Sequence, residues 1–70
     1  PMANIQLNVE GITCGGCEKS IRNALLGKEG VSDASASHET GIVKIDYDEA
    51  KIQQDAIKQA IEDAGFDVAA

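Results

Sequence analysis

The chain shows two hydrophobic periods, one of two residues, typical of strands, and one of about 3.6 residues, typical of helices. Asn4 to Glu10 alternates polar and apolar residues, which predicts a half-buried strand. Ile42 to Tyr47 repeats this pattern and predicts another strand, whereas Val31 to Ser37 is poorer in β-formers and predicts a weaker one. Phe66 to Val68 is expected to begin a last, short strand.

Helical spacing of apolar residues occurs twice. We expect one helix from about Gly16 to Leu26 and a second from about Gln53 to Ala64, with Gly65 as the C-cap of the second. His38 to Gly41 reads as a hairpin turn, and Asp46 to Lys51 as a polar connecting loop. The predicted order is therefore β-α-β-β-α-β.

One antiparallel sheet with both helices on one face is the simplest way to bury these stripes, which makes the chain an α+β protein. Right-handed crossovers and the strand order 4-1-3-2 bring residues 11–17, the hairpin at His38 and the Gly65-Phe66 turn to one end of the sheet. His38 is expected about 10 Å to the side, and Met2 at the opposite end. Six apolar residues are expected to be core: Ile21, Leu25, Val43, Ile45, Ile57 and Ile61.

The two cysteines of the chain, Cys14 and Cys17, stand three residues apart where the first strand leads into the first helix. Cys17 falls near the first helical turn, where unpaired N–H groups and the helix dipole favour a thiolate. Gly15 and Gly16 lack Cβ atoms, so we expect them to let the backbone turn both sulfurs toward one point. Such a pair is either a redox dithiol or a clamp for a soft metal ion. Two sulfur ligands suit Cu(I). Zn(II) needs four ligands, and the sequence offers only one histidine in addition to the two cysteines.

Length and charge narrow the range of possible functions. Seventy residues predict a single domain, residues 1–70, with no room for a deep substrate cleft. The sequence contains no acid–base pair and no nucleophile with a base, so we do not expect an enzyme. A net charge of −6 argues against nucleic acid and anionic membranes and suits a basic docking surface on another protein. No apolar run approaches the roughly 20 residues of a membrane span, and residues 1–4 contain no segment of signal-peptide type. Cysteines without a disulfide framework indicate a reducing compartment.

Gly11-Ile12-Thr13-Cys14-Gly15-Gly16-Cys17 resembles the Gly-Met-Thr-Cys-x-x-Cys signature of heavy-metal-associated domains, and the resemblance extends through residues 41–48 and 61–66. This family comprises small copper chaperones, N-terminal modules of copper-transporting P-type ATPases and related mercury-binding proteins. It implies a ferredoxin-like sandwich in which Cys14 and Cys17 hold Cu(I). Ile12 replaces the usual methionine and is expected to pack beneath the loop. Phe66 stands where chaperones often carry tyrosine or lysine and ATPase modules carry phenylalanine.

We therefore expect a soluble, cytoplasmic metallochaperone that transfers Cu(I) by cysteine ligand exchange to a copper-transporting P-type ATPase or another cysteine-bearing acceptor. Cys14, on the more mobile side of the loop, is expected to exchange most readily. An excised ATPase module and a mercury-binding relative are the alternatives. A thiol–disulfide protein is disfavoured, because thioredoxin-like proteins are longer and need a cis proline beside the disulfide, whereas the one proline here is Pro1. We expect a monomer, with metal-linked dimerisation left open.

Five further residues bear on the cysteine site. Thr13 is either a hydrogen-bond partner of a sulfur or an ordinary loop residue, and Phe66 is expected to form an apolar wall beside the loop. Lys19 either moderates the charge of a bis-thiolate site or is an ordinary surface lysine. His38 is expected to be a solvated hairpin residue and not a ligand, and Met2 lies at the wrong end to bind the same ion.

Overall fold

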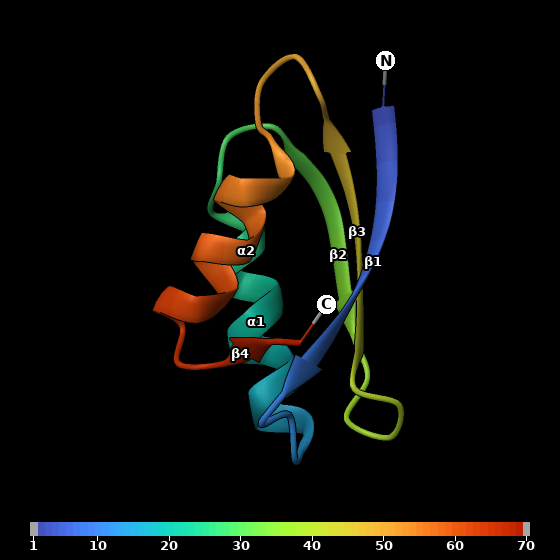
Figure 1. The fold of residues 1–70 in the computed structure, drawn as a ribbon, viewed down its shortest axis with the longest axis vertical. Helices are drawn as coiled ribbons and strands as arrows, with labels where there is room; N and C mark the ends of the chain where they lie inside the picture. Colours follow the sequence, from blue (N-terminus) through green and yellow to red (C-terminus); the bar gives the residue numbers. More distant parts are fainter. Residues whose placement is uncertain (1, 70) are drawn as a thin grey trace.

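The hydrophobic pattern folds into two layers, a four-stranded antiparallel sheet with two helices on one of its faces (Figure 1). The computed structural model describes residues 2–69, so Pro1 and Ala70, the ends of the expected 1–70 domain, lie outside the described residues. The elements are β1 (Met2–Glu10), α1 (Gly15–Leu26), β2 (Val31–Ala36), β3 (Ile42–Asp48), α2 (Gln54–Asp63) and β4 (Asp67–Val68). This order confirms the predicted α+β fold.

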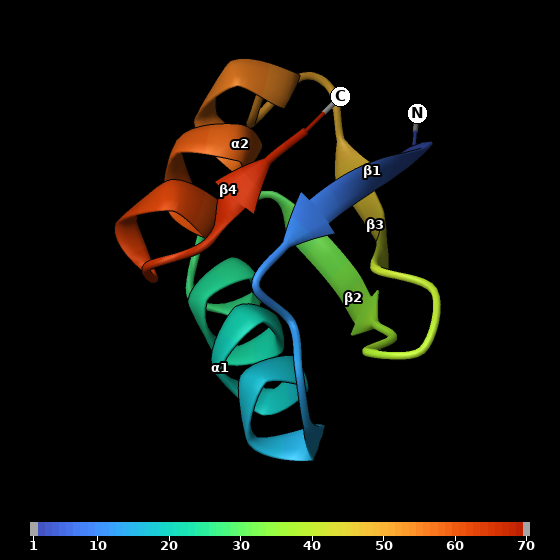
Figure 2. The same cartoon turned by 60° about the horizontal axis from the view of Figure 1, so that its bottom comes forward.

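β1 and β3 form the centre of the sheet, whose strand order, β2-β3-β1-β4, is the predicted one. Leu7 lies opposite Val43 and Ile5 opposite Ile45, so the apolar side chains of the central strands share the face beneath the helices. β4 pairs with the last residues of β1 and lies beside its end (Figure 2). The end of β1, the start of α1 and the β2–β3 hairpin therefore meet at one end of the molecule (Figure 1).

The layer between sheet and helices is filled by the side chains predicted to fill it. All six expected core residues have no exposed surface: Ile21, Leu25, Val43, Ile45, Ile57 and Ile61. Ile52, in the connection between β3 and α2, is also buried, and the periodic pattern did not reveal it because it stands outside both elements. Because each fully buried side chain of this size contributes about 1.5–3 kcal/mol, this core holds the two layers together.

Two strands are longer than predicted. β1 begins at Met2 instead of Asn4, and β3 continues to Asp48, so the expected polar loop from Asp46 to Lys51 is wrong over its first residues. Met2 pairs with Asp48 in the ladder, and the Asn4 side chain donates a hydrogen bond to the carboxylate of Asp46. The polar residues here belong to the sheet because their backbones pair across β1 and β3, and the bond between Asn4 and Asp46 adds a side-chain link between the two strands.

The helices differ from prediction only at their ends. α1 begins one residue earlier than expected, and α2 is shorter at both ends. Ala56 has the spacing of the apolar residues of α2, Ile57, Ala60 and Ile61, but it is exposed. Neither helix described between residues 2 and 69 combines the length and the apolar character needed to cross a bilayer.

Gly30, between α1 and β2, is predicted to be the glycine least tolerant of a side chain. Its φ is +99°, and an added Cβ would approach the Cβ of Lys51 to 2.8 Å and Cγ2 of Ile52 to 2.9 Å. We expect Gly30→Ala to lower the free energy of unfolding by about 2–4 kcal/mol, from backbone strain and overpacking together, as measured by urea denaturation. Gly15→Ala is the control, because its Cβ would meet nothing within 4 Å. Equal losses in the two variants would contradict this reading.

Candidate metal centre

The cysteine segment connects the end of β1 to the start of α1. The chain turns at Gly11, whose φ of +96° favours glycine, and is anchored by the buried side chain of Ile12, as expected for the residue that replaces methionine. Cys14 is the N-cap of α1 and has an extended backbone. Its carbonyl oxygen accepts the N–H of Cys17 at 3.1 Å and the N–H of Glu18 at 3.2 Å. This cap places the second cysteine in the first helical turn.

The two thiols lie side by side, with their Sγ atoms 3.7 Å apart. Both are free; Cys14 is exposed and Cys17 is half-buried against the core. The extended cap and the helical turn bring them together without help from glycine. Neither Gly15 nor Gly16 has a positive φ, and a Cβ on Gly16 would meet the Cys14 sulfur at an ordinary 3.7 Å. The expectation that glycine is what turns the sulfurs toward each other is therefore wrong.

Hydrogen bonds lower the pKa of the Cys17 thiol. The backbone N–H and the hydroxyl of Thr13 are the main causes, and the Cys14 thiol adds to them. The Thr13 hydroxyl oxygen lies 3.7 Å from the Cys17 sulfur. Of the two roles left open for Thr13, the structure supports that of sulfur partner. A lower pKa increases the thiolate fraction near neutral pH, and the thiolate is the form that binds metal.

Two sulfurs are what this end of the molecule offers a metal ion. Across residues 2–69, no three His, Cys, Asp or Glu side chains converge closely enough to hold an ion together. A thiolate pair suits Cu(I) or Hg(II) and leaves Zn(II) short of its usual four ligands. Two metal–sulfur bonds of about 2.3 Å in a straight line would separate the sulfurs by about 4.6 Å. The thiols, 3.7 Å apart, would have to separate further to bind an ion linearly.

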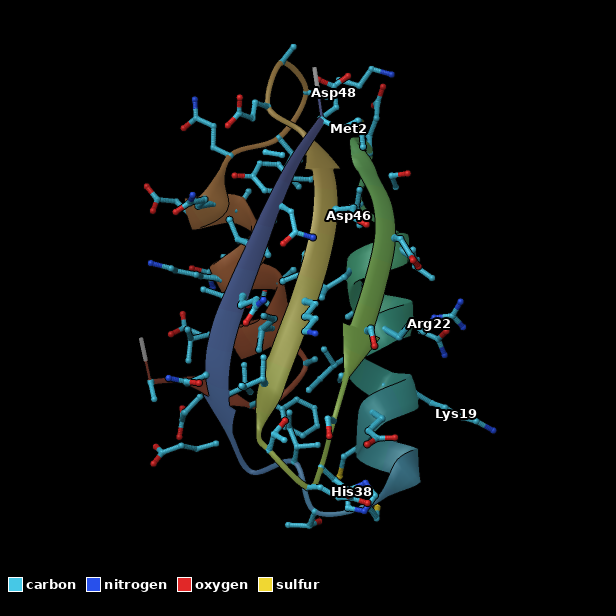
Figure 3. All side chains as sticks on the ribbon, turned by 90° about the vertical axis from the view of Figure 1, so that its right-hand side faces the viewer. Met2, Lys19, Arg22, His38, Asp46 and Asp48 are labelled. Carbon is cyan, nitrogen blue, oxygen red and sulfur yellow. The ribbon has the colours of Figure 1, made fainter. Side chains whose placement is uncertain are left out.

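The other residues considered from the sequence lie in three different places. Phe66 packs against the core beside Gly11, where it forms the expected apolar wall. Met2 is 57% exposed at the opposite end of the sheet, as predicted (Figure 3). Lys19 is exposed and points away from the sheet, which favours its reading as an ordinary surface residue (Figure 3).

His38 is exposed, as expected for a solvated hairpin residue, but it also contacts α1, which its expected position about 10 Å to the side did not reveal. Its backbone N–H donates to Oε2 of Glu18 at 2.6 Å, and its Nδ1 lies 2.7 Å from the same oxygen. These bonds hold the pKa of the Glu18 carboxyl below its usual value. The expected sideways distance came from the order of the strands in the sheet. It did not reveal the contact with Glu18 because α1 packs over β2 and reaches the hairpin. No periodicity links residues 18 and 38, so the sequence offered only their complementary chemistry as a signal.

Comparisons with known proteins agree with this geometry. Residues 6–67 match the heavy-metal-associated domain. The chain is similar to the copper chaperone CopZ of Staphylococcus aureus strain JH9, with 44% identity over 62 residues that cover 89% of this chain and 91% of the relative. A solved CopZ metallochaperone superposes with a TM-score of 0.94 at 40% identity, covering 96% of this chain and 100% of the other. A copper-binding domain from HMA7, a P-type ATPase, gives a TM-score of 0.90 at 35% identity, covering 96% and 93%.

Replacing Thr13 by valine is predicted to raise the pKa of the Cys17 thiol toward its ordinary value. The rise is partial, because the backbone N–H of residue 13 remains. With less thiolate present near neutral pH, alkylation of Cys17 by iodoacetamide should slow by about two- to fivefold, as followed by mass spectrometry of the metal-free protein. Thr13→Ser keeps the hydroxyl and should react like the unaltered protein. Alkylation of Thr13→Val at the original rate would show that the hydroxyl does not lower the pKa of Cys17.

Proposed function

The chain belongs to the heavy-metal-associated domain family, and we propose that residues 1–70 act as one Cu(I)-carrying domain, a metallochaperone that passes copper to a cysteine-bearing acceptor. Its chemistry is ligand exchange, so the protein is a carrier and not an enzyme. Similarity to a protein named copper chaperone over 89% of the chain supports this proposal. So does the absence of any third converging ligand among residues 2–69.

The observation that carries the proposal is the pair of free thiols, Cys14 and Cys17, 3.7 Å apart at the end of the sheet. A structural metal site encloses its ion in four protein ligands. Here one sulfur is exposed and the other half-buried, so one side of the pair stays open to a second molecule. An open two-sulfur site suits an ion that must be delivered.

Transfer from this pair is a substitution at the metal with no change of oxidation state. An acceptor thiolate forms a bond to Cu(I) held by Cys14 and Cys17, which gives a three-coordinate ion. The bond to Cys14 then breaks and this cysteine leaves as a thiolate, after which a second acceptor thiolate displaces Cys17 in the same way. Cys14 leaves first because it is exposed, whereas Cys17 is half-buried and hydrogen-bonded to Thr13.

The charges near the cysteines favour an acceptor with a basic surface, such as a metal-binding domain of a copper-transporting P-type ATPase. Glu10 and Asp67 lie directly opposite each other in the β1–β4 ladder, one residue from the start of the cysteine segment. Glu62 and Asp63 are the last two residues of α2, the helix that packs against β4. Like charges opposite each other in a sheet destabilise it, so a cationic partner would relieve repulsion on binding.

We place the protein in the cytoplasm, because a cysteine pair that binds metal has to stay reduced, and a reducing compartment keeps thiols reduced. A metal-binding module of a copper-transporting ATPase is the second candidate. It is favoured by the similarity to the HMA7 domain and by Phe66, which packs beside the cysteine segment. Both candidates hold Cu(I) on Cys14 and Cys17, so the predictions below apply to either.

Replacement of either cysteine by serine is predicted to abolish tight Cu(I) binding. Each variant leaves one thiolate, and a serine hydroxyl is a hard ligand that suits Cu(I) poorly. Affinity is measured by competition with a Cu(I) chelator, and an unchanged circular dichroism spectrum checks the fold. Met2→Leu, which removes the one thioether of the chain, is the control and should bind like the unaltered protein. Full affinity in Cys14→Ser or Cys17→Ser would end the two-sulfur proposal.

Transfer to a cysteine-bearing acceptor is predicted to slow several-fold as salt rises from about 0.1 M to 1 M, because the Debye length falls from about 10 Å to about 3 Å. The affinity for Cu(I) should scarcely change, since its bonds are to sulfur. Both quantities are measured on the same samples by stopped-flow and chelator competition.

The variants Glu10→Gln and Asp67→Asn test which charges guide this docking. Each should slow transfer at low salt, whereas Glu49→Gln, at the other end of the molecule in the β3–α2 connection, should not. A transfer rate indifferent to salt and to all three substitutions would mean that the acidic surface does not guide docking.

A further inference from the structure

The β2–β3 hairpin is hydrogen-bonded to both ends of the cysteine segment. Before the segment, the N–H of Val9 donates to the carbonyl of Gly41 at 2.8 Å. After it, the carboxylate of Glu18 accepts the N–H of His38 at 2.6 Å. Figure 3 shows His38 at the end of the sheet where the hairpin meets the start of α1. The cysteines thus stand on a stretch of chain held at both ends by one turn.

Glu18 links the hairpin to the thiols through its own backbone. Its N–H bonds the Cys14 carbonyl at 3.2 Å, beside the N–H of Cys17 at 3.1 Å. Its side-chain Oε2 receives both the backbone N–H and the Nδ1–H of His38, at 2.6 and 2.7 Å. One residue therefore contacts the helix cap with its backbone and the hairpin with its carboxylate. Without that carboxylate, the hydrogen bonds between the first turn and the hairpin would be lost.

The contact between Glu18 and His38 is specific. Within residues 2–69 no other acidic side chain lies within 4.0 Å of a basic one, although the chain has 12 acidic residues. Glu39, in the same hairpin, is exposed, and the described residues give its side chain no hydrogen bond. A general excess of acidic residues therefore does not explain the pair.

We infer that Glu18 and His38 are positioning residues for metal exchange, an inference that rests on the proposed copper-carrying function. The pair fixes the first turn of α1 and, with it, Cys17. The widening of the sulfur separation that linear coordination requires then falls to Cys14, which is also the first sulfur to leave during transfer. Glu18 acts through the helical turn and is not a metal ligand.

The test compares Glu18→Ala with Glu39→Ala, because each variant loses one carboxylate. In the metal-free protein, amide hydrogen exchange read by NMR should accelerate about fivefold at residues 17, 18 and 38 of Glu18→Ala. Exchange in Glu39→Ala should match that of the unaltered protein. His38→Ala, which keeps the backbone bond, should give a smaller acceleration. His38→Asn, whose side-chain N–H can take the place of Nδ1–H, should restore the original rates.

Cu(I) affinity separates positioning from a simple charge effect. Loss of a held turn should weaken binding by about threefold in Glu18→Ala. A carboxylate acting only through its charge would have the opposite effect, since its removal favours an anionic bis-thiolate site. Glu18→Gln removes the charge and keeps one acceptor oxygen, so it should lie between Glu18→Ala and the unaltered protein in amide exchange.

The outcomes that would overturn the two proposals differ. If the unaltered protein bound no Cu(I), the carrier function would fail, whatever the exchange rates. If the unaltered protein bound Cu(I) but Glu18→Ala exchanged its amides at the original rates, the positioning role alone would fail. Tighter Cu(I) binding by Glu18→Ala would likewise overturn positioning in favour of the charge effect.

Discussion

Both helices must bury their apolar stripes against one face of a single sheet, and the place of everything else follows from this requirement. α1 can cover that face only by running back along the sheet from the end of β1, so the connecting segment has to reverse at the edge of the core. Ile12 enters the core and anchors this segment from below. The cysteines are thereby held at the boundary between the core and solvent, where thiols can be kept in place and still be reached.

That boundary gives two cysteines of one short segment different surroundings. Cys14 caps the helix with its carbonyl and leaves its side chain in solvent, whereas Cys17 lies in the first turn against the core. Hydrogen bonds from Thr13 reach only the second sulfur. A symmetric pair of ligands has no preferred first leaving group, whereas in an unequal pair the more exposed ligand is the one expected to leave first. The inequality comes from the position of the helix start and from the hydrogen bonds of Thr13.

The sequence predicted the parts of this structure that depend on repeated burial. The period of two in β1 and β3 and the helical period in α2 each recur over several residues, so one exception such as Ala56 does not obscure them. Strand order followed because right-handed crossovers leave few alternatives. Single events leave no such pattern in the sequence: the burial of Ile52 has no repeat, and the end of β3 depends on how Asp48 pairs across the sheet.

The cysteine site could likewise be predicted from the sequence only in part. Spacing and helix position identified Cys14 and Cys17 as neighbours because residues three apart lie close together at a helix start. The role assigned to the glycines was wrong, because an extended N-cap already aims one sulfur at the other. The contact of Glu18 with His38 joins residues 20 apart across two layers, and its geometry exists only once α1 has packed on β2. Contacts of this kind can give the cysteine segment properties that its sequence signature alone does not determine.

In the proposed function, metal binding and partner recognition would use different parts of this molecule. Affinity for the ion would come mainly from its two bonds to sulfur, which salt hardly affects. Recognition would depend on the acidic residues beside the cysteine segment, where Glu10 faces Asp67 across the β1–β4 ladder. A change at these two residues would then be expected to alter the choice of acceptor more than the affinity for the ion. The fold allows this separation because its core, and not the metal, holds the two layers together.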